Sequence, residues 1–198
     1  MRRLLAMGLV VLAVSGLLQA APASADPFPG NCHFAGGGNN LKWKDLTTTS
    51  SYSAVAHAAI QAWNSTSTQF NFTEVTSGAN VTITDGNFGQ YYEGAASAGL
   101  TLTNTGGDPL EACTGGTWDQ GLVVWLNTYY TDHYDPARRQ ANMVHELGHA
   151  LGLDHTTPPR EGQRCFPSIM DVNLDKNWIP CGRTVPAQDD INVANSLY

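Results

Sequence analysis

One stretch decides what the sequence predicts about fold and function: HELGHALGLDH, residues 145–155. His145 and His149 are four residues apart, so on a helix their side chains lie on one face, about 5 to 6 Å from each other. Both imidazoles can then direct a ring nitrogen at a single metal ion. Glu146 would lie beside that ion without ligating it, where a carboxylate can take a proton from a metal-bound water.

A third ligand is needed, because catalytic zinc sites usually use three protein ligands and leave one position for water or substrate. His155 is the candidate. A straight helix would carry residue 155 away from the ion, so the chain must turn, and Gly152 stands where a left-handed helix end is required. Asp154 is the alternative third ligand, although its spacing differs by one residue.

The segment before this stretch predicts the helix that carries it. Asp135 suits an N-cap and Pro136 suits the first helical position, so we expect a helix from there to Leu151. Apolar residues also recur at helical spacing from Tyr52 onward. We expect that earlier helix to follow an N-cap at Ser51.

Two further features complete the expected helices. Asn64 suits the end of the earlier helix, and Pro186 precedes a last helix in which Ile191 and Ala194 share a face with Leu197 or Tyr198. Between the helices, clusters of β-branched and aromatic residues predict strands, and residues 85–121 form a loop-rich region around a few of them. The expected strands are 41–46, 70–75, 81–84, 100–103 and 122–126. The chain is therefore expected to be an α+β protein.

The first 25 residues have the layout of a secretory signal peptide. Arg2 and Arg3 precede an apolar run from Leu4 to Leu18, and Ala23-Ser24-Ala25 provides small residues for cleavage after Ala25. A signal anchor is the alternative, but the apolar run is shorter than the roughly 20 residues that a bilayer requires. We expect a lead segment over 26–40 and a catalytic domain over 41–198, with a C-terminal subdomain from about residue 153.

Charge and cysteine content indicate the environment of the mature chain. Cleavage would remove two of the 10 Lys and Arg residues and none of the 17 Asp and Glu residues, so the net charge would change from −7 to −9. This balance argues against nucleic acid or an anionic membrane as a partner. Four cysteines in an exported chain predict two disulfides with three connectivities, of which we favour Cys32 with Cys113 and Cys165 with Cys181.

The quoted stretch resembles the long zinc motif HExxHxxGxxH of the metzincin metallopeptidases. Met170, in Ser168-Ile169-Met170, resembles the methionine of that family's Met-turn, which packs beneath the zinc ligands. Residues 59–64, 70–75 and 79–83 resemble the first helix and following strands of the matrixins, and 188–191 with 196–198, in the segment 188–198, resemble their closing helix. The cysteines on either side of Met170 resemble those of snapalysin-like secreted proteases, which usually have Asp where this chain has His155.

The resemblance implies a twisted mixed β-sheet with two long helices, followed by a small subdomain with the Met-turn and the final helix. It implies a secreted, extracellular zinc endopeptidase that hydrolyses peptide bonds through a zinc-bound water activated by Glu146. One catalytic Zn²⁺ and polypeptide substrates are expected, with no membrane attachment of the mature form and a monomeric chain. The strand with Leu100, Thr101 and Leu102 resembles the matrixin strand that borders the cleft and binds substrate.

Other assignments stay open from the sequence. Calcium is a further candidate cofactor because Asp residues in loops supply the oxygen ligands it prefers. The candidate ligands are Asp85, Asp108 and Asp119. A secreted binding protein that kept the fold without activity, and a zinc hydrolase acting on a non-peptide amide, are the alternative functions.

Overall fold

The structure is a computed structural model that describes residues 25–156, 168–172, 174 and 181–198. The predicted signal peptide lies outside the described residues except for Ala25. Cys165 also lies outside them. Among the residues that the structure describes, no helix combines the length and apolar character needed to cross a bilayer.

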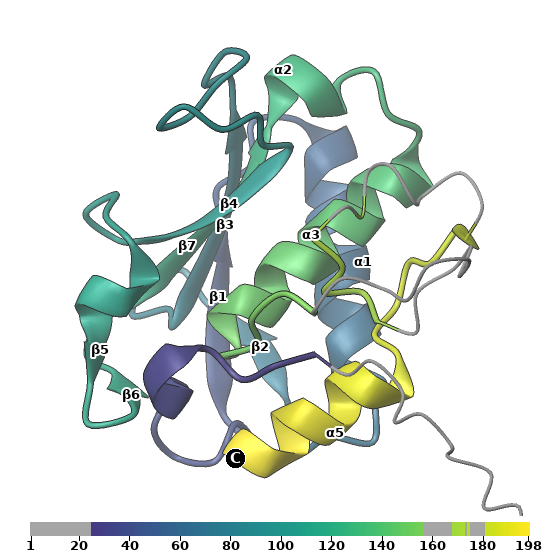
Figure 1. The fold of residues 1–198 in the computed structure, drawn as a ribbon. Coiled ribbons are helices and arrows are strands. Elements are labelled where there is room, and N and C mark those ends of the chain that lie inside the picture. The colour runs from purple at the N-terminus through teal and green to yellow at the C-terminus, as the bar shows by residue number, and fades with distance from the viewer. Residues whose placement is uncertain (1–24, 157–167, 173, 175–180) are drawn as a thin grey trace, which may run out of the picture.

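A five-stranded mixed sheet forms the centre of the fold, in the order β2-β1-β3-β7-β4 (Figure 1). The first four strands are parallel to their neighbours, and β4 pairs with β7 in the antiparallel direction. This order leaves β4 at one edge of the sheet. The strands are β1 (Leu41–Asp45), β2 (Phe72–Glu74), β3 (Val81–Gly86), β4 (Gly99–Thr103) and β7 (Leu122–Asn127).

Alternating side chains explain why the central strands form. In β3, Val81 and Ile83 are fully buried while the residues between them are partly exposed, and β7 repeats the pattern with Leu122 and Val124. Side chains on a strand alternate between its two faces, so these residues line one apolar face. The register aligns them, with Val81 opposite Leu122 and Ile83 opposite Val124.

Two 15-residue helices, α1 (Ser50–Asn64) and α3 (Pro136–Ala150), lie on the same side of this sheet (Figure 1). They pack directly against each other, and the indole nitrogen of Trp63 in α1 donates a hydrogen bond of 3.0 Å to the carbonyl oxygen of Val144 in α3. The predicted α+β class, mixed sheet and two long helices are confirmed. The helix α3 thereby packs against both α1 and the strands β7 and β4.

The ends of the helices agree with the prediction in two places and differ in one. Asp135 caps α3 as predicted, because its carboxylate accepts hydrogen bonds from the backbone of Ala137 and Arg138. The closing helix α5 (Gln188–Leu197) also follows Pro186 as expected. The predicted N-cap of α1 at Ser51 is wrong: the cap is Thr49, whose hydroxyl accepts from the backbone N–H three residues later, and Ser51 lies in the first turn.

Short elements that the sequence did not predict surround the sheet. All but one occupy the loop-rich middle of the chain and its N-terminal lead, where glycine and proline are frequent, and the exception follows β7 directly. They are η1 (Pro29–Asn31), η2 (Pro109–Ala112), the β5 (Cys113–Thr114) and β6 (Thr117–Trp118) hairpin, and α2 (Thr128–Thr131).

The N-terminal segment is tied to this hairpin and to the end of α3. The predicted disulfide between Cys32 and Cys113 is confirmed, with Cα atoms 5.8 Å apart. Pro27 forms an antiparallel bridge with Leu153. Cys181 is also in a disulfide, but its predicted partner lies outside the described residues. The lead segment therefore lies beside the part of the chain that precedes His155.

Candidate metal centre

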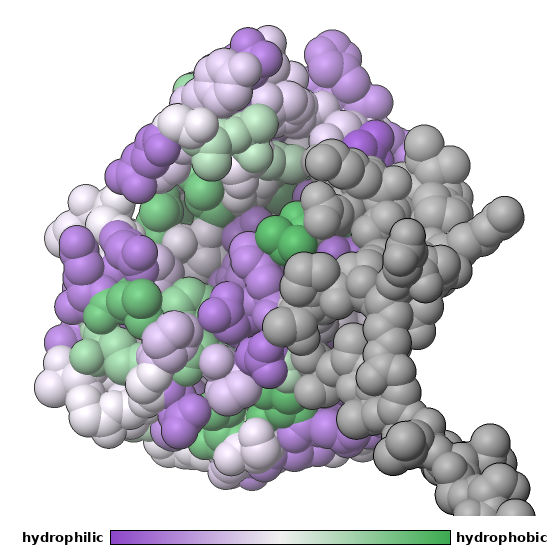
Figure 2. Space-filling view, in the orientation of Figure 1, coloured by the Kyte–Doolittle hydropathy of each residue, from purple (hydrophilic) through white to green (hydrophobic). Residues whose placement is uncertain are grey.

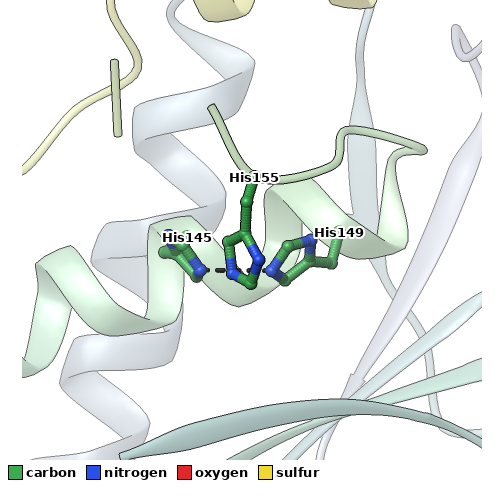
Figure 3. A group of neighbouring side chains, drawn as sticks. All are labelled: His145, His149 and His155. Carbon is green, nitrogen blue, oxygen red and sulfur yellow. Dashed lines mark hydrogen bonds between the residues drawn. The ribbon is translucent and has the colours of Figure 1, made fainter. Parts of the chain in front are cut away.

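Three histidines meet at the end of α3. His145 and His149 come from successive turns of the helix, and His155 returns to them after the chain has turned at Gly152 (Figure 3). One nitrogen from each ring lies within 4.8 Å of the others. Within the described residues, this is the group of His, Cys, Asp and Glu side chains that is arranged to hold a metal ion.

The turn that returns His155 depends on Gly152. Its φ of +95° lies in the region that glycine reaches easily and other residues rarely adopt. Its N–H donates to the carbonyl of His149, and the next N–H donates to the carbonyl of Gly148. A Cβ at this position would collide with the backbone carbonyl of Cys32. The predicted role of this glycine as the helix end is thus explained both by conformation and by space.

Hydrogen bonds to the backbone orient the two helical imidazoles. The Nδ1 atom of His145 lies 2.8 Å from the carbonyl oxygen of Ile169, and that of His149 lies 2.8 Å from the carbonyl oxygen of Leu153. A carbonyl oxygen only accepts, so each Nδ1 must carry the proton. Each neutral ring then directs an unprotonated Nε2 toward the other, which is the form that ligates a metal.

The donor set fits a zinc ion. The two Nε2 atoms are 3.1 Å apart, close to the roughly 3.3 Å that tetrahedral zinc with 2.0 Å bonds imposes on its ligands. Two lone pairs at this distance repel each other unless a cation lies between them. Burial lowers the pKa of His145 to about 4 and lowers the pKa of His149 well below its usual value, so both rings are neutral at pH 7.

Glu146 lies between the helix and the edge strand. The residue is 7% exposed, and burial raises the pKa of its carboxyl group to about 8, while the hydrogen bond from Thr101 opposes that shift. A cation held by the histidines would also oppose it, because a nearby positive charge favours the carboxylate. The Thr101 hydroxyl is 3.0 Å from Oε2 of Glu146.

Met170, the methionine of the predicted Met-turn, packs against α3 at Gly148. It is fully buried, and a Cβ at Gly148 would collide with its sulfur. The glycine inside α3 therefore allows the thioether to approach the helix backbone between the two histidines. The backbone of Met170 also accepts a hydrogen bond from the N–H of Thr156, which follows His155 directly.

A buried carboxylate in α5 holds this turn in place. Asp190 accepts hydrogen bonds from the backbone N–H of Ile169 at 2.9 Å and from the hydroxyl of Ser168 at 2.5 Å. The carbonyl of Ile169 in turn accepts from His145, so α5 is connected to the first histidine through the backbone of one residue. Burial raises the pKa of Asp190, although its hydrogen bonds favour the charged form.

The N-terminal segment contacts the second histidine. The ring of Phe28 meets the rings of His149 and Trp118 edge to face, each with centroids 5.9 Å apart. Its backbone N–H donates to the carbonyl of Gly152 at 2.7 Å, and the N–H of Asp154 donates to the carbonyl of Asp26. This segment therefore brackets the loop that carries His155.

A cleft of about 710 Å³ opens over the histidines and is bordered by β4. In Figure 2, hydrophilic side chains gather in the middle of the visible face, over the second half of α3, and hydrophobic ones border them. Of the predicted substrate-binding residues, Leu100 and Thr101 line the cleft, and Leu102 is buried. The side chain of Thr101 contacts Glu146, and substrate binding by this strand stays a prediction.

The three acidic candidates for calcium have local partners. Asp85 accepts hydrogen bonds from the backbone N–H and hydroxyl of Thr48. Asp108 caps η2, and Asp119 accepts from Thr114. Calcium binding stays a prediction.

The sequence did not predict three features of the site. They are the position of Phe28, the contact of Thr101 with Glu146, and the buried carboxylate of Asp190. Asp190 belongs to the segment 188–198 that resembles the family's closing helix, and this resemblance is the signal that could have indicated a buried carboxylate. For the other two, helical and strand periodicity carry no signal, because their partners are more than 40 residues away in the chain.

No family model matches the sequence. Among solved structures, this chain is similar to the crystal structure of myroilysin, with a TM-score of 0.49 and 15% sequence identity, over 83% of this chain and 85% of that one. What the chain does is therefore inferred from its own residues.

Proposed function

We propose that this chain is a secreted zinc-dependent endopeptidase of the metzincin kind, most similar to the matrixins. One observation carries the proposal: three imidazoles converge at a cleft, with the carboxylate of Glu146 beside them. The ligand set is His145, His149 and His155. The sequence resemblance, from the zinc motif to Met170, supports the family.

A zinc ion held by His145, His149 and His155 would supply Lewis acidity toward the scissile carbonyl and toward a water molecule, whose pKa it would lower to about 7. Glu146 acts as the general base. Its carboxylate takes the proton from the attacking water and then delivers it to the leaving amine, which is the usual role of a carboxylate next to such a metal. No covalent intermediate with the chain is needed.

The position of β4 supports a polypeptide as the substrate. It is the edge strand, so the outer side of its backbone is available to pair with an extended chain. Leu100 on this strand lines the cleft, and so does Val172, which follows Met170 by two residues. A peptide bound along β4 would carry its scissile carbonyl over the three histidines.

The signal-peptide pattern of residues 1–25 and the disulfide between Cys32 and Cys113 support secretion, because disulfides persist in oxidising compartments. We propose cleavage after Ala25 and an extracellular, monomeric mature chain. Its partners are then its polypeptide substrates.

The test is digestion of casein by residues 26–198 loaded with zinc. Glu146→Ala should lower the rate by at least about a hundredfold, because general-base catalysis contributes on that scale. A matched control is Glu74→Ala, which removes a half-exposed carboxylate from β2 at the opposite edge of the sheet. Chelation should abolish cutting and added zinc should restore it.

Three other results would contradict the proposal in different ways. No cutting by folded, zinc-loaded protein would favour a binding protein. Zinc-dependent hydrolysis of small amides with intact casein would favour a non-peptide hydrolase. Equal losses in Glu146→Ala and Glu74→Ala would remove Glu146 from the mechanism.

A further inference from the structure

The general base proposed above is held by one residue of the edge strand. The hydroxyl oxygen of Thr101 lies 2.7 Å from the main-chain oxygen of Glu146 and 3.0 Å from its Oε2 atom. Thr101 is 9% exposed and Glu146 is 7% exposed, so water competes little for these contacts. Within the part of the chain that the structure describes, Thr101 is the one side chain that donates to this carboxylate.

Gly99 provides the space that the Glu146 side chain occupies. It lies two residues before Thr101, so the two positions face the same side of β4. A Cβ on Gly99 would lie 2.7 Å from Cγ and 2.8 Å from Oε1 of Glu146, closer than atoms of these kinds approach each other. The strand therefore combines a gap at one position with a hydrogen-bond donor at the next position on that face.

Protein folding alone does not require the second contact of the hydroxyl. The main-chain oxygen of Glu146 belongs to the helix α3, where it can accept the regular hydrogen bond of the helix. A valine could fill the volume of Thr101, with β-branching that suits a strand equally well. What valine cannot do is hold Oε2 with a hydrogen bond, which in the native chain leaves Oε1, next to Gly99, as the oxygen without a side-chain donor.

We propose that Thr101, with the space left by Gly99, is a positioning residue that fixes the orientation of the Glu146 carboxylate toward the attacking water. This inference rests on the proposed peptidase function for its kinetic consequence, but its structural part does not. Oε2 accepts the hydrogen bond from Thr101, which in this proposal leaves Oε1 to take the proton.

The experiment compares Thr101→Val with Thr101→Ser in the zinc-loaded chain of residues 26–198. Because a hydrogen bond to a charged group is removed, kcat for a peptide substrate should fall about tenfold or more in the valine variant, while KM changes less than about twofold. Serine keeps the hydroxyl and should restore kcat to within about threefold of wild type. Zinc content should be the same in all three proteins.

Thr131→Val is the matched control. Thr131 is fully buried, and its hydroxyl likewise has two partners, donating to the carbonyl of Asn127 at 2.9 Å and contacting the hydroxyl of Tyr52. It does not touch Glu146. This variant should lose thermal stability as Thr101→Val does, yet keep the wild-type kcat.

Crystal structures of the zinc-loaded wild type and Thr101→Val provide a readout without turnover. The Glu146 carboxylate should leave β4 in the valine variant and remain there in the serine variant. An unmoved carboxylate in Thr101→Val overturns the proposal, as does a wild-type kcat or a loss of kcat equal to that of Thr131→Val. If the wild type cuts no peptide, the peptidase function fails, and the position of Glu146 in the two crystal structures still decides the positioning role.

Discussion

Replacing Gly152 with alanine should damage stability and metal binding together. The residue has a φ of +95°, and an added Cβ would collide with the main-chain oxygen of Cys32 and lie 3.1 Å from Cδ1 of Leu197. Neither the disulfide-bonded Cys32 nor the buried loop can move freely. The chain must therefore shift at the turn that returns His155 to the other two ligands.

The magnitude follows from two separate costs. An L-residue forced into a left-handed conformation costs about 1 to 2 kcal/mol. Overpacking against backbone that cannot relax adds about 1 to 3 kcal/mol. The free energy of unfolding should thus fall by about 2 to 5 kcal/mol, which for a chain of this size lowers Tm by roughly 5 to 15 °C. A displaced His155 should weaken zinc binding about tenfold or more, since every 1.4 kcal/mol is a factor of ten.

Gly78→Ala separates the two costs. Gly78 has a φ of +69°, and a Cβ there would meet no atom within 4 Å. This variant should lose only about 1 to 2 kcal/mol and keep the wild-type zinc affinity. Urea unfolding with a chelator present measures the stability of the metal-free proteins, and competition with a chromophoric chelator measures zinc affinity.

Two results would refute this reasoning. Equal destabilisation by Gly152→Ala and Gly78→Ala would mean that the collision with Cys32 is relieved without cost. A wild-type zinc affinity in Gly152→Ala would mean that the position of His155 does not depend on the turn.

Two further predictions concern the N-terminal segment and a surface histidine. Phe28→Ala should weaken zinc binding severalfold and lower the free energy of unfolding by about 1 to 3 kcal/mol, because the ring packs edge to face against His149 and Trp118. An unchanged zinc affinity in the same competition assay would show that this ring does not support the site. The pKa of His57 is raised by its hydrogen bond to the carbonyl of Ser53 and by Glu74, so its contribution to stability is complete below pH 6.5 and is lost as pH rises through the raised pKa. Wild type should therefore be more stable than His57→Gln near pH 5.5, and the difference in the free energy of unfolding should stay below about 1 kcal/mol because the side chain is half exposed. At pH 8.5 this difference should be smaller. A difference in urea unfolding that does not change with pH would contradict the prediction.

The parts of the site that the sequence predicted are those within one helix and the turn after it. The four-residue spacing of His145 and His149 follows from the helical period, and Gly152 marks the turn that His155 requires. Such relations involve neighbours in the chain, so the residue pattern determines them almost alone. The error at the N-cap of α1 arose because Thr49, Ser50 and Ser51 all suit a cap, and local pattern does not choose among them.

The sequence by itself determined the main helices, the strands and the three candidate ligands. It also favoured the disulfide between Cys32 and Cys113, which belongs to one of the three possible connectivities. Only the tertiary structure decided that β4 turns antiparallel at the sheet edge, which brings Thr101 to Glu146, and that the N-terminal segment brings Phe28 to His149. The physical reason is the range of the contacts: a helix or strand repeats with a period visible in the residues, whereas the packing of segments distant in the chain depends on how the whole core fills its volume.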